Sequence, residues 1–232
     1  MKFYVMDLYL TGPNGMWFSY LKPDLEGKTP TCPGCGEVVG SIPSLPPYRV
    51  ELTVFGKSPS DVARGPNNAL LLSERFRAAW ENAQLGGLEF LPLDRLRVRP
   101  ARLGKKNLTY YYAPILLFGT QVDVERSLIE YDRPITCQKC KSGGVDTVRG
   151  FSIDETSWSG EDMFYAWGMP GPVIVTDRVR QLRDDYGLTN VNLTPTEKHV
   201  WDPLNKWTPV DYSRPDWAAP DEDDAQDAST TN

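Results

Sequence analysis

The sequence has very little histidine, since His199 is the only one among 232 residues. A single histidine in a polar segment gives almost no basis for Ser-His-Asp or Cys-His catalysis, or for a catalytic metal held by imidazoles. Glycine-rich phosphate loops and the G-x-S-x-G nucleophile pattern are absent as well. Neighbouring acids such as Asp154-Glu155 and Glu161-Asp162 are typical of solvated loops. We therefore expect a protein that is not an enzyme.

Excess positive charge and long apolar runs are also missing. The chain has 25 basic and 31 acidic residues, and six of the acids lie between residues 216 and 227, where there is no base. The rest of the chain is close to neutral, which argues against general binding to nucleic acid or to an anionic membrane. No stretch approaches the roughly 18 apolar residues of a membrane helix. Because charged Lys2 and Asp7 interrupt the N-terminal apolar residues, we expect no targeting segment and a cytoplasmic protein.

One local exception to this neutrality lies in the middle of the chain. Six basic residues gather there without an acid: Arg95, Arg97, Arg99, Arg102, Lys105 and Lys106. We interpret them as the solvated side of an edge strand or loop. A contiguous basic face in this region would instead favour a nucleic-acid partner.

Cysteine is scarce and confined to two C-x-x-C motifs about a hundred residues apart. Two residues between the cysteines allow both thiolates to face one ion, while the tight turn directs backbone N–H groups at sulfur. In a reducing compartment such motifs are metal ligands or redox groups more often than disulfides. We predict one structural zinc ion bound by Cys32, Cys35, Cys137 and Cys140. Separate metal sites, no metal, and a thiol–disulfide site stay open as alternatives.

The two cysteine motifs belong to a longer repeat. Residues 70–75, Leu-Leu-Leu-Ser-Glu-Arg, follow the first motif, and residues 173–178, Val-Ile-Val-Thr-Asp-Arg, follow the second. The order of an apolar run, a hydroxyl residue, an acid and an arginine predicts a strand followed by a helix, with Ser73 and Thr176 as N-caps. We interpret the pattern as a diverged internal duplication with halves of about 1–100 and 101–213.

The predicted fold class is α+β, with two related β-rich halves that each carry one main helix and are linked by a four-cysteine zinc-knuckle site. The buried faces of the two helices are expected to hold Phe76, Ala79, Trp80 and Ala83, and Val179, Leu182 and Tyr186. Residues 162–165 suggest a short helical turn, and Pro114 is expected to interrupt the strand candidates around it. Residues 1–213 are predicted to form a single domain, and 214–232 an acidic, disordered tail.

Each predicted helix begins with an acid and an arginine. Arg75 follows Glu74, and Arg178 follows Asp177. We expect these arginines to form ion pairs at exposed helix starts, while contact with a partner protein is the alternative.

Taken together, these landmarks resemble the double-CxxCG motif family of myxobacteria, which is described as Sit-type immunity proteins. The residues that carry the resemblance are Cys32-Pro33-Gly34-Cys35-Gly36, Cys137-Gln138-Lys139-Cys140, Asp162-Met163-Phe164 and the 173–178 segment. The resemblance covers about residues 1–195. It departs at Lys141, where the second motif of the family tends to have glycine.

The resemblance implies a small cytoplasmic antitoxin for kin discrimination. Members of the family are encoded beside lipoprotein toxins that pass between neighbouring cells, and each immunity protein binds and neutralises its cognate toxin. This chain is accordingly expected to be a non-catalytic, zinc-binding immunity protein with a protein toxin as partner. The alternative is a zinc-ribbon-like regulatory or nucleic-acid-binding protein. A redox or metal-dependent enzyme is a third hypothesis.

Overall fold

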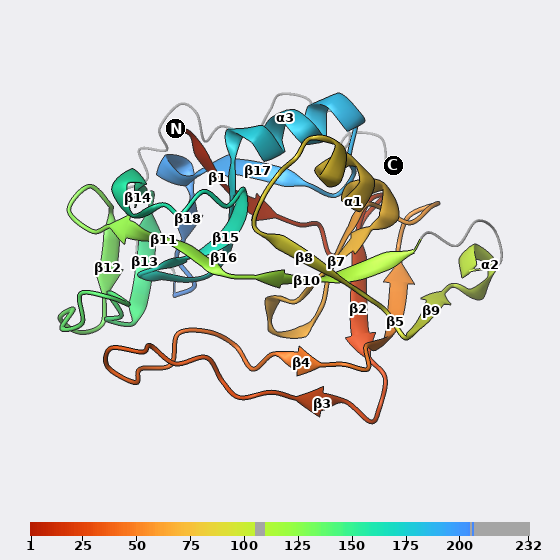
Figure 1. Cartoon of the computed structure of the whole chain (residues 1–232), viewed down its shortest axis with the longest axis horizontal. Coiled ribbons are helices and arrows are strands. Elements are labelled where there is room, and N and C mark those ends of the chain that lie inside the picture. Colours follow the sequence, from red (N-terminus) through yellow and green to blue (C-terminus); the bar gives the residue numbers. More distant parts are fainter. Residues whose placement is uncertain (105–109, 205, 207–232) are drawn as a thin grey trace, which may run out of the picture. The chain divides into compact units, whose positions relative to one another are not determined.

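The computed structural model describes residues 1–104, 110–204 and 206. Strands dominate the described residues, and the three α-helices among them are short (Figure 1). The predicted β-rich α+β class is therefore confirmed. The compact unit described below spans Met1–Val200. The predicted domain limit at residue 213 and the predicted tail, 214–232, lie outside the described residues.

The first large sheet has seven strands in the order β8-β10-β7-β6-β2-β5-β9. Neighbours run antiparallel except for the pairs β2·β6 and β5·β9, which are parallel. In β5 the apolar residues Val50, Leu52 and Val54 are buried in alternation, as the pattern of the sequence predicts for a strand with one face on the core. The strands are β2 (Met16–Tyr20), β5 (Arg49–Val54), β6 (Val62–Arg64), β7 (Leu70–Ser73), β8 (Leu88–Pro92), β9 (Arg95–Arg99) and β10 (Tyr111–Leu116).

The second large sheet has six strands, and its order read from the far edge is β17-β1-β16-β15-β11-β14. Only the pair β11·β15 is parallel. The strands are β1 (Phe3–Asp7), β11 (Phe118–Asp123), β14 (Ser152–Asp154), β15 (Met163–Trp167), β16 (Met169–Thr176) and β17 (Asn192–Pro195).

The two sheets repeat one topology. Position by position, β8-β10-β7-β6-β2-β5 matches β17-β1-β16-β15-β11-β14, and every neighbouring pair has the same relative direction in both sheets. The match also shows an exchange. Strand β1 begins the chain but lies in the sheet of the second half, whereas β10 opens the second half but lies in the sheet of the first. Each half thus completes the sheet of the other. Strand β9 has no counterpart among the described strands.

Each half carries a hairpin between equivalent strands. Strands β3 (Leu25–Glu26) and β4 (Ser44–Leu45) pair between β2 and β5, and β12 (Ile129–Tyr131) and β13 (Val145–Arg149) pair between β11 and β14. The first cysteine motif lies between β3 and β4, and the second between β12 and β13. Strand β18 (Val200–Trp201) ends the described elements.

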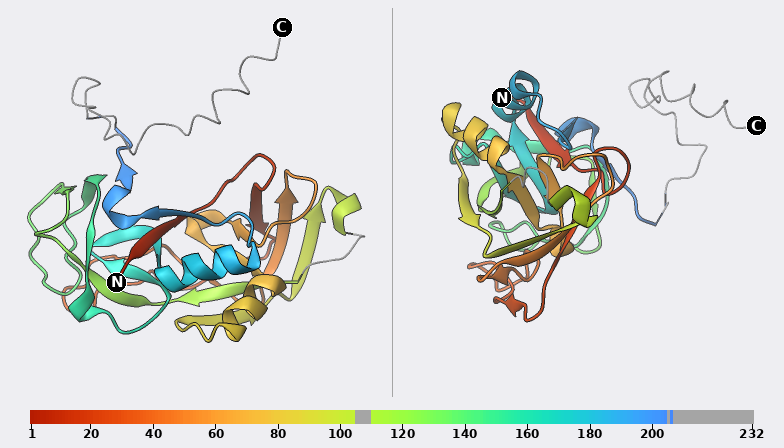
Figure 2. Two further views of the ribbon diagram at one scale, coloured as in Figure 1. Left: turned by 90° about the horizontal axis from the view of Figure 1, so that it is seen from above. Right: turned by 90° about the vertical axis from the view of Figure 1, so that its right-hand side faces the viewer.

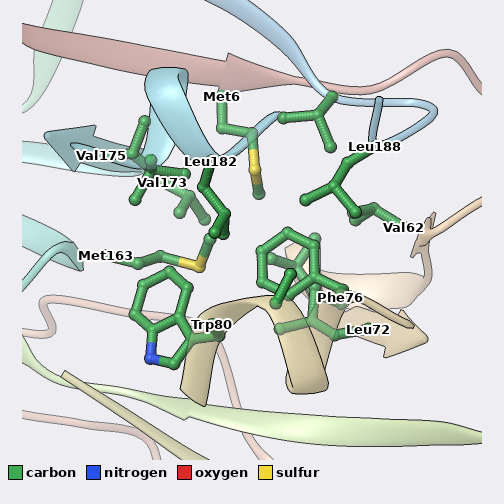
Figure 3. Close-up of a cluster of buried hydrophobic side chains, with 14 of the residues drawn as sticks. Met6, Val62, Leu72, Phe76, Trp80, Met163, Val173, Val175, Leu182 and Leu188 are labelled. Carbon is green, nitrogen blue, oxygen red and sulfur yellow. The ribbon is translucent and has the colours of Figure 1, made fainter. Parts of the chain in front are cut away.

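Helices α1 (Glu74–Asn82) and α3 (Asp177–Tyr186) follow the equivalent strands β7 and β16. The two helices lie side by side, as the views in Figure 2 show. Figure 3 shows Phe76 and Trp80 of α1 facing Leu182 of α3 and Met163 of β15, all almost fully buried. Burying one such side chain contributes about 1.5–3 kcal/mol, so this shared core joins the halves. The other helical segments are α2 (Ala101–Gly104), η1 (Pro66–Asn68), η2 (Glu155–Ser157) and η3 (Thr196–Lys198).

Three local predictions are wrong or incomplete. Residues 163–165 form part of β15 rather than a helical turn, because pairing with β11 and β16 on both sides outweighs local preference. Pro114 does not interrupt β10, which runs through it in register with Phe90 of β8. Tyr186 is 42% exposed and lies off the buried face of α3. No helix among the described residues is long and apolar enough to cross a membrane.

Candidate metal centre

The four cysteines, far apart in the sequence, come together between the two hairpins. Their Sγ atoms all lie within 4.8 Å of one another. Equivalent cysteines face each other, with Sγ–Sγ distances of 3.9 Å between Cys32 and Cys137 and 3.6 Å between Cys35 and Cys140. The cluster therefore bridges the two halves, as predicted.

These distances suit a tetrahedral metal site. A Zn–S bond of about 2.3 Å places the sulfurs of a four-thiolate tetrahedron about 3.8 Å apart. The two direct distances fall on either side of that value. A disulfide has an S–S bond of about 2.0 Å, so the cysteines are not bonded to one another. The donor set fits a metal ion such as zinc.

The two motifs fold into the same turn, named here the first knuckle (residues 32–36) and the second knuckle (137–141). In the first, the N–H of Gly36 donates to the Cys32 carbonyl at 2.9 Å, and in the second the N–H of Lys141 donates to the Cys137 carbonyl at the same distance. Gly36 has φ +76° and Lys141 has φ +48°. Lysine therefore takes the left-handed conformation that glycine takes in the first knuckle, at a cost of about 1 kcal/mol.

Lys141 also makes a contact that glycine cannot. Its Nζ donates to the carbonyl oxygen of Val122 on β11 at 2.8 Å. Lysine in place of glycine at this position thus leaves the turn unchanged and ties the second knuckle to the six-stranded sheet.

Backbone N–H groups surround the sulfurs. The Gly34 N–H donates to Cys32 Sγ at 3.3 Å. Burial acts to raise the pKa of the Cys32 thiol, but the Gly34 and Cys35 N–H groups outweigh it and hold the pKa below its usual value. The N–H groups of Cys140 and Lys139 lower the pKa of Cys137 to about 6. Such donors stabilise thiolates, the form in which cysteine binds a metal.

The surroundings of the cluster differ from one side to the other. Cys32 and Cys140 are buried, Cys137 is half-buried and Cys35 is exposed. Burial raises the pKa of Cys140 to about 12, because the Ser142 N–H, which acts to lower this pKa, does not make up for the desolvation of the thiolate. A bound cation would supply the missing counter-charge. Apolar neighbours close the buried side: Val39, Phe118 and Trp167, with the rings of the last two stacked at 4.0 Å.

No model of a known protein family matches the chain, and no curated protein matches it.

The arginines that open the two helices form a second, reciprocal set of contacts. Arg75 pairs with the buried carboxylate of Asp61, at 2.6 Å between Nη2 and Oδ2, and Arg178 pairs with Asp162, at 2.9 Å between Nη1 and Oδ2. The expected ion pairs are therefore present, but with these distant acids instead of the adjacent Glu74 and Asp177. Each aspartate immediately precedes an equivalent strand, β6 or β15.

Both aspartates also hold the helix N-caps. Ser73 Oγ donates to Asp61 at 2.8 Å, and Thr176 Oγ1 donates to Asp162 at 2.6 Å. Ser73 caps α1 as predicted, since its Oγ accepts from the Phe76 N–H at 3.0 Å. Thr176 stands at the cap position of α3, but its side chain makes no capping bond there.

The two clusters link the halves crosswise. Arg75 donates to the carbonyl of Gly187 at the end of α3, while Arg178 donates to the carbonyls of Ala83 and Gln84 at the end of α1. Each helix start thus caps the end of the other helix, where a cation is favourable.

The aspartates complete these links through backbone N–H groups. Asp61 accepts from the N–H of Thr189, which follows α3, at 2.8 Å, and Asp162 accepts from the N–H of Gly86, which follows α1, at 2.9 Å. Asp61 is not among the functional residues predicted from the sequence. A signal existed, because Asp61-Val62-Ala63 occupies the place in the first half that Asp162-Met163-Phe164 occupies in the second.

His199 stands apart from the four-cysteine cluster. It is half-buried and packs edge-on against Phe151, with ring centroids 5.9 Å apart. Burial lowers its pKa, while Asp7 acts in the opposite direction.

Proposed function

We propose that Cys32, Cys35, Cys137 and Cys140 bind one structural zinc ion that joins the two halves. The observation that supports this proposal is the meeting of equivalent cysteines at distances close to a tetrahedral edge. Four thiolates fill the coordination shell of the ion and leave no position for a water, so this site has no catalytic role. Elemental analysis should give one zinc per chain, and cobalt substitution should give a tetrahedral thiolate spectrum. Two metals per chain or none would contradict a single shared site.

The proposed mode of action is binding without turnover. A cavity of about 520 Å³ lies between residues 38–44 and strands β10, β15 and β16, and its lining in the described chain has no acid, base, histidine or cysteine. The serine and tyrosine hydroxyls of the lining therefore have no histidine, lysine or carboxylate in the pocket to activate them, which favours binding over catalysis.

The proposed partner is a protein toxin. The support comes from the resemblance to Sit-type immunity proteins carried by the two cysteine motifs, the Asp162-Met163-Phe164 step and the 173–178 segment. In the structure these residues are the metal ligands, the Asp162 cluster and the start of α3, so the shared residues are those that build the scaffold. On this proposal the scaffold is common to the family, and the contact surface for the toxin lies elsewhere on the chain.

Co-expression tests the proposal directly. Cells producing the toxin encoded by the adjacent upstream gene are scored for growth with the native chain and with Cys32→Ser/Cys137→Ser. Rescue by the native chain, with a soluble complex on pull-down, is expected, and the cysteine variant should lose both protection and solubility. Arg126→Gln, on a side chain that is 82% exposed, serves as the control that keeps protection. Growth arrest despite abundant soluble native chain would contradict toxin neutralisation.

A second candidate is a zinc-ribbon-like nucleic-acid-binding protein. It is favoured by one observation, the row of exposed arginines on β9. Salt-dependent binding of a single-stranded or duplex oligonucleotide would support it, with affinity falling steeply as salt rises.

A further inference from the structure

The outer face of strands β5 and β9 is basic. Arg95, Arg97 and Arg99 alternate along β9 and are exposed, whereas Leu96 and Val98 between them are half-buried on the core side. In register with them on β5 stand Arg49, Glu51 and Thr53. This set of residues is named the arginine face.

The arginine face has more arginines than acids and therefore carries a net positive charge. Glu51 forms ion pairs with both Arg97, at 3.2 Å, and Arg99, at 2.8 Å, and it is the one acid of the face. Arg49 and Arg95 make no ion pair with any described residue. The next strand, β2, places Trp17 and Ser19 beside Thr53 and Glu51 and adds no charge. An anionic partner would therefore meet unpaired guanidinium groups here.

The same strand has a free edge. Strand β9 ends the seven-stranded sheet, and β5 is its one partner among the described strands. The Arg95 N–H donates inward, to the carbonyl of Tyr48 at 3.2 Å. Because backbone groups alternate sides along a strand, the N–H and C=O groups of Leu96 and Val98 point to the outer edge.

Strand β9 is also where the two halves differ. The six-stranded sheet ends at β14, the equivalent of β5, and no described strand takes the place of β9. Charged side chains on an edge strand protect it from aggregation. That role does not account for the presence of an added strand, since the described part of the other sheet has no such strand.

We propose that the arginine face and the free edge of β9 bind an acidic, extended segment of a partner protein as an added strand. Main-chain hydrogen bonds to Leu96 and Val98 would hold the segment, and acidic side chains at alternate positions would meet Arg95, Arg97 and Arg99, which share the same two-residue period. The proposal rests on the proposed function only in naming the toxin as the source of the segment. A nucleic acid has no alternating N–H and C=O groups to use this edge.

The first test uses a defined probe. A synthetic peptide of alternating glutamate and valine is titrated into the full-length protein, and hydrogen exchange is measured at the amides of Leu96 and Val98. Protection of both amides by about tenfold or more is expected on saturation. A peptide of alternating lysine and valine should leave both amides unprotected. Equal protection by the two peptides, or none by either, would overturn the proposal, as would an oligonucleotide that binds this face while the acidic peptide does not.

Two variants of equal net charge test whether the acidic peptide binds the arginine face itself or is attracted by the net charge of the protein. Arg95→Gln/Arg99→Gln keeps the pair of Arg97 with Glu51 and removes two charges, so the acidic peptide should bind about tenfold more weakly or worse. Lys57→Gln/Arg126→Gln removes the same charge from two exposed positions elsewhere and should bind like the native chain. An equal loss in both variants would show attraction to the net charge alone and would overturn the proposal.

The toxin experiment distinguishes this proposal from the proposed function. If the toxin binds the native chain and the Arg95→Gln/Arg99→Gln variant equally well, neutralisation stands and the arginine face is not its contact surface. If the toxin does not bind, yet the acidic peptide protects Leu96 and Val98, the binding edge stands and neutralisation falls. Weaker toxin binding by this variant alone supports both.

Discussion

Replacing Asp61 by asparagine is expected to destabilise the protein by about 2–4 kcal/mol. The carboxylate is buried, with one oxygen accepting from Ser73 and Arg75 and the other from Arg75 and Thr189. An asparagine has one oxygen and one NH₂ group in the same space. Whichever way the amide is turned, the NH₂ group faces an N–H donor of Arg75 or Thr189.

The size of this loss of stability follows from how deeply Asp61 and Arg75 are buried. Breaking a fully buried ion pair costs about 3–5 kcal/mol. The Asp61 side chain is 8% exposed, but that of Arg75 is 51% exposed, so water partly solvates the guanidinium after the change and the cost is smaller. For a domain of this size 1 kcal/mol lowers Tm by roughly 2–4 °C, which gives an expected fall of about 5–15 °C.

The stability lost in Asp61→Asn should depend on pH in a defined direction. Burial acts to raise the pKa of Asp61, but hydrogen bonds from Arg75, Thr189 and Ser73 outweigh it and hold the pKa below the ordinary value of 3.8. A lowered pKa in the folded state means that the charged carboxylate stabilises the protein above about pH 4, and that this stabilisation disappears as pH falls through the lowered pKa. The gap between the native chain and Asp61→Asn should therefore be constant from pH 5 to 8 and should narrow below about pH 4.

Thermal and urea unfolding of the two proteins across this pH range provide the assay. Glu74→Gln is the matched control, because it removes a carboxylate that also pairs with an arginine but is 41% exposed, and it should cost no more than about 1 kcal/mol. If Asp61→Asn is no less stable than Glu74→Gln at pH 7, the cluster is not a stabilising link between the halves and the reasoning is refuted.

Further predictions concern the metal and the glycine positions. Chelation of zinc at neutral pH should lower stability by about 4 kcal/mol when free zinc had been a thousandfold above its Kd, and thermal scans with and without added zinc check this. Gly65→Ala should cost about 3 kcal/mol or more in urea unfolding, because the new Cβ would lie 2.3 Å from the Phe18 ring. Gly12→Ala is the control, because its Cβ would meet nothing within 4 Å. It should cost only about 1 kcal/mol, owing to its φ of +83°. Lys141→Gly should be more stable than Lys141→Ala by about 1 kcal/mol, since both lose the bond to Val122 and only glycine relieves the left-handed backbone; equal stabilities would show that the second knuckle stores no such strain.

The parts of the fold that sequence reasoning found are those with local causes. Alternation in residues 50–54 predicts β5, the hydroxyl of Ser73 predicts the start of α1, and the spacing of each C-x-x-C pair predicts its turn. The repeat of these signals also predicts two related halves linked by the cysteines. Each of these inferences needs only a few neighbouring residues.

The parts that it missed depend on distant partners. Nothing near residues 163–165 shows that they lie between two other strands, and nothing near Pro114 shows that β10 tolerates it. The exchange of β1 and β10 is decided by pairing over the length of a half, for which a single sequence has no local signal. Asp61 lies in a polar loop, where its role depends on an arginine 14 residues later and on the opposite helix end.

Features that the two halves share differ in their contacts from β9, the described strand that only one half has. Features present in both halves, namely the knuckles, the exchanged first strands and the two aspartate–arginine clusters, all join one half to the other. The contacts that define them are made within the chain. Among the described strands, β9 occurs once, pairs with β5 alone, and presents unpaired arginines beside its open edge. Because β9 is the described strand that breaks the repeat and carries exposed arginines at a sheet edge, it should be tested as a binding surface before any symmetric surface.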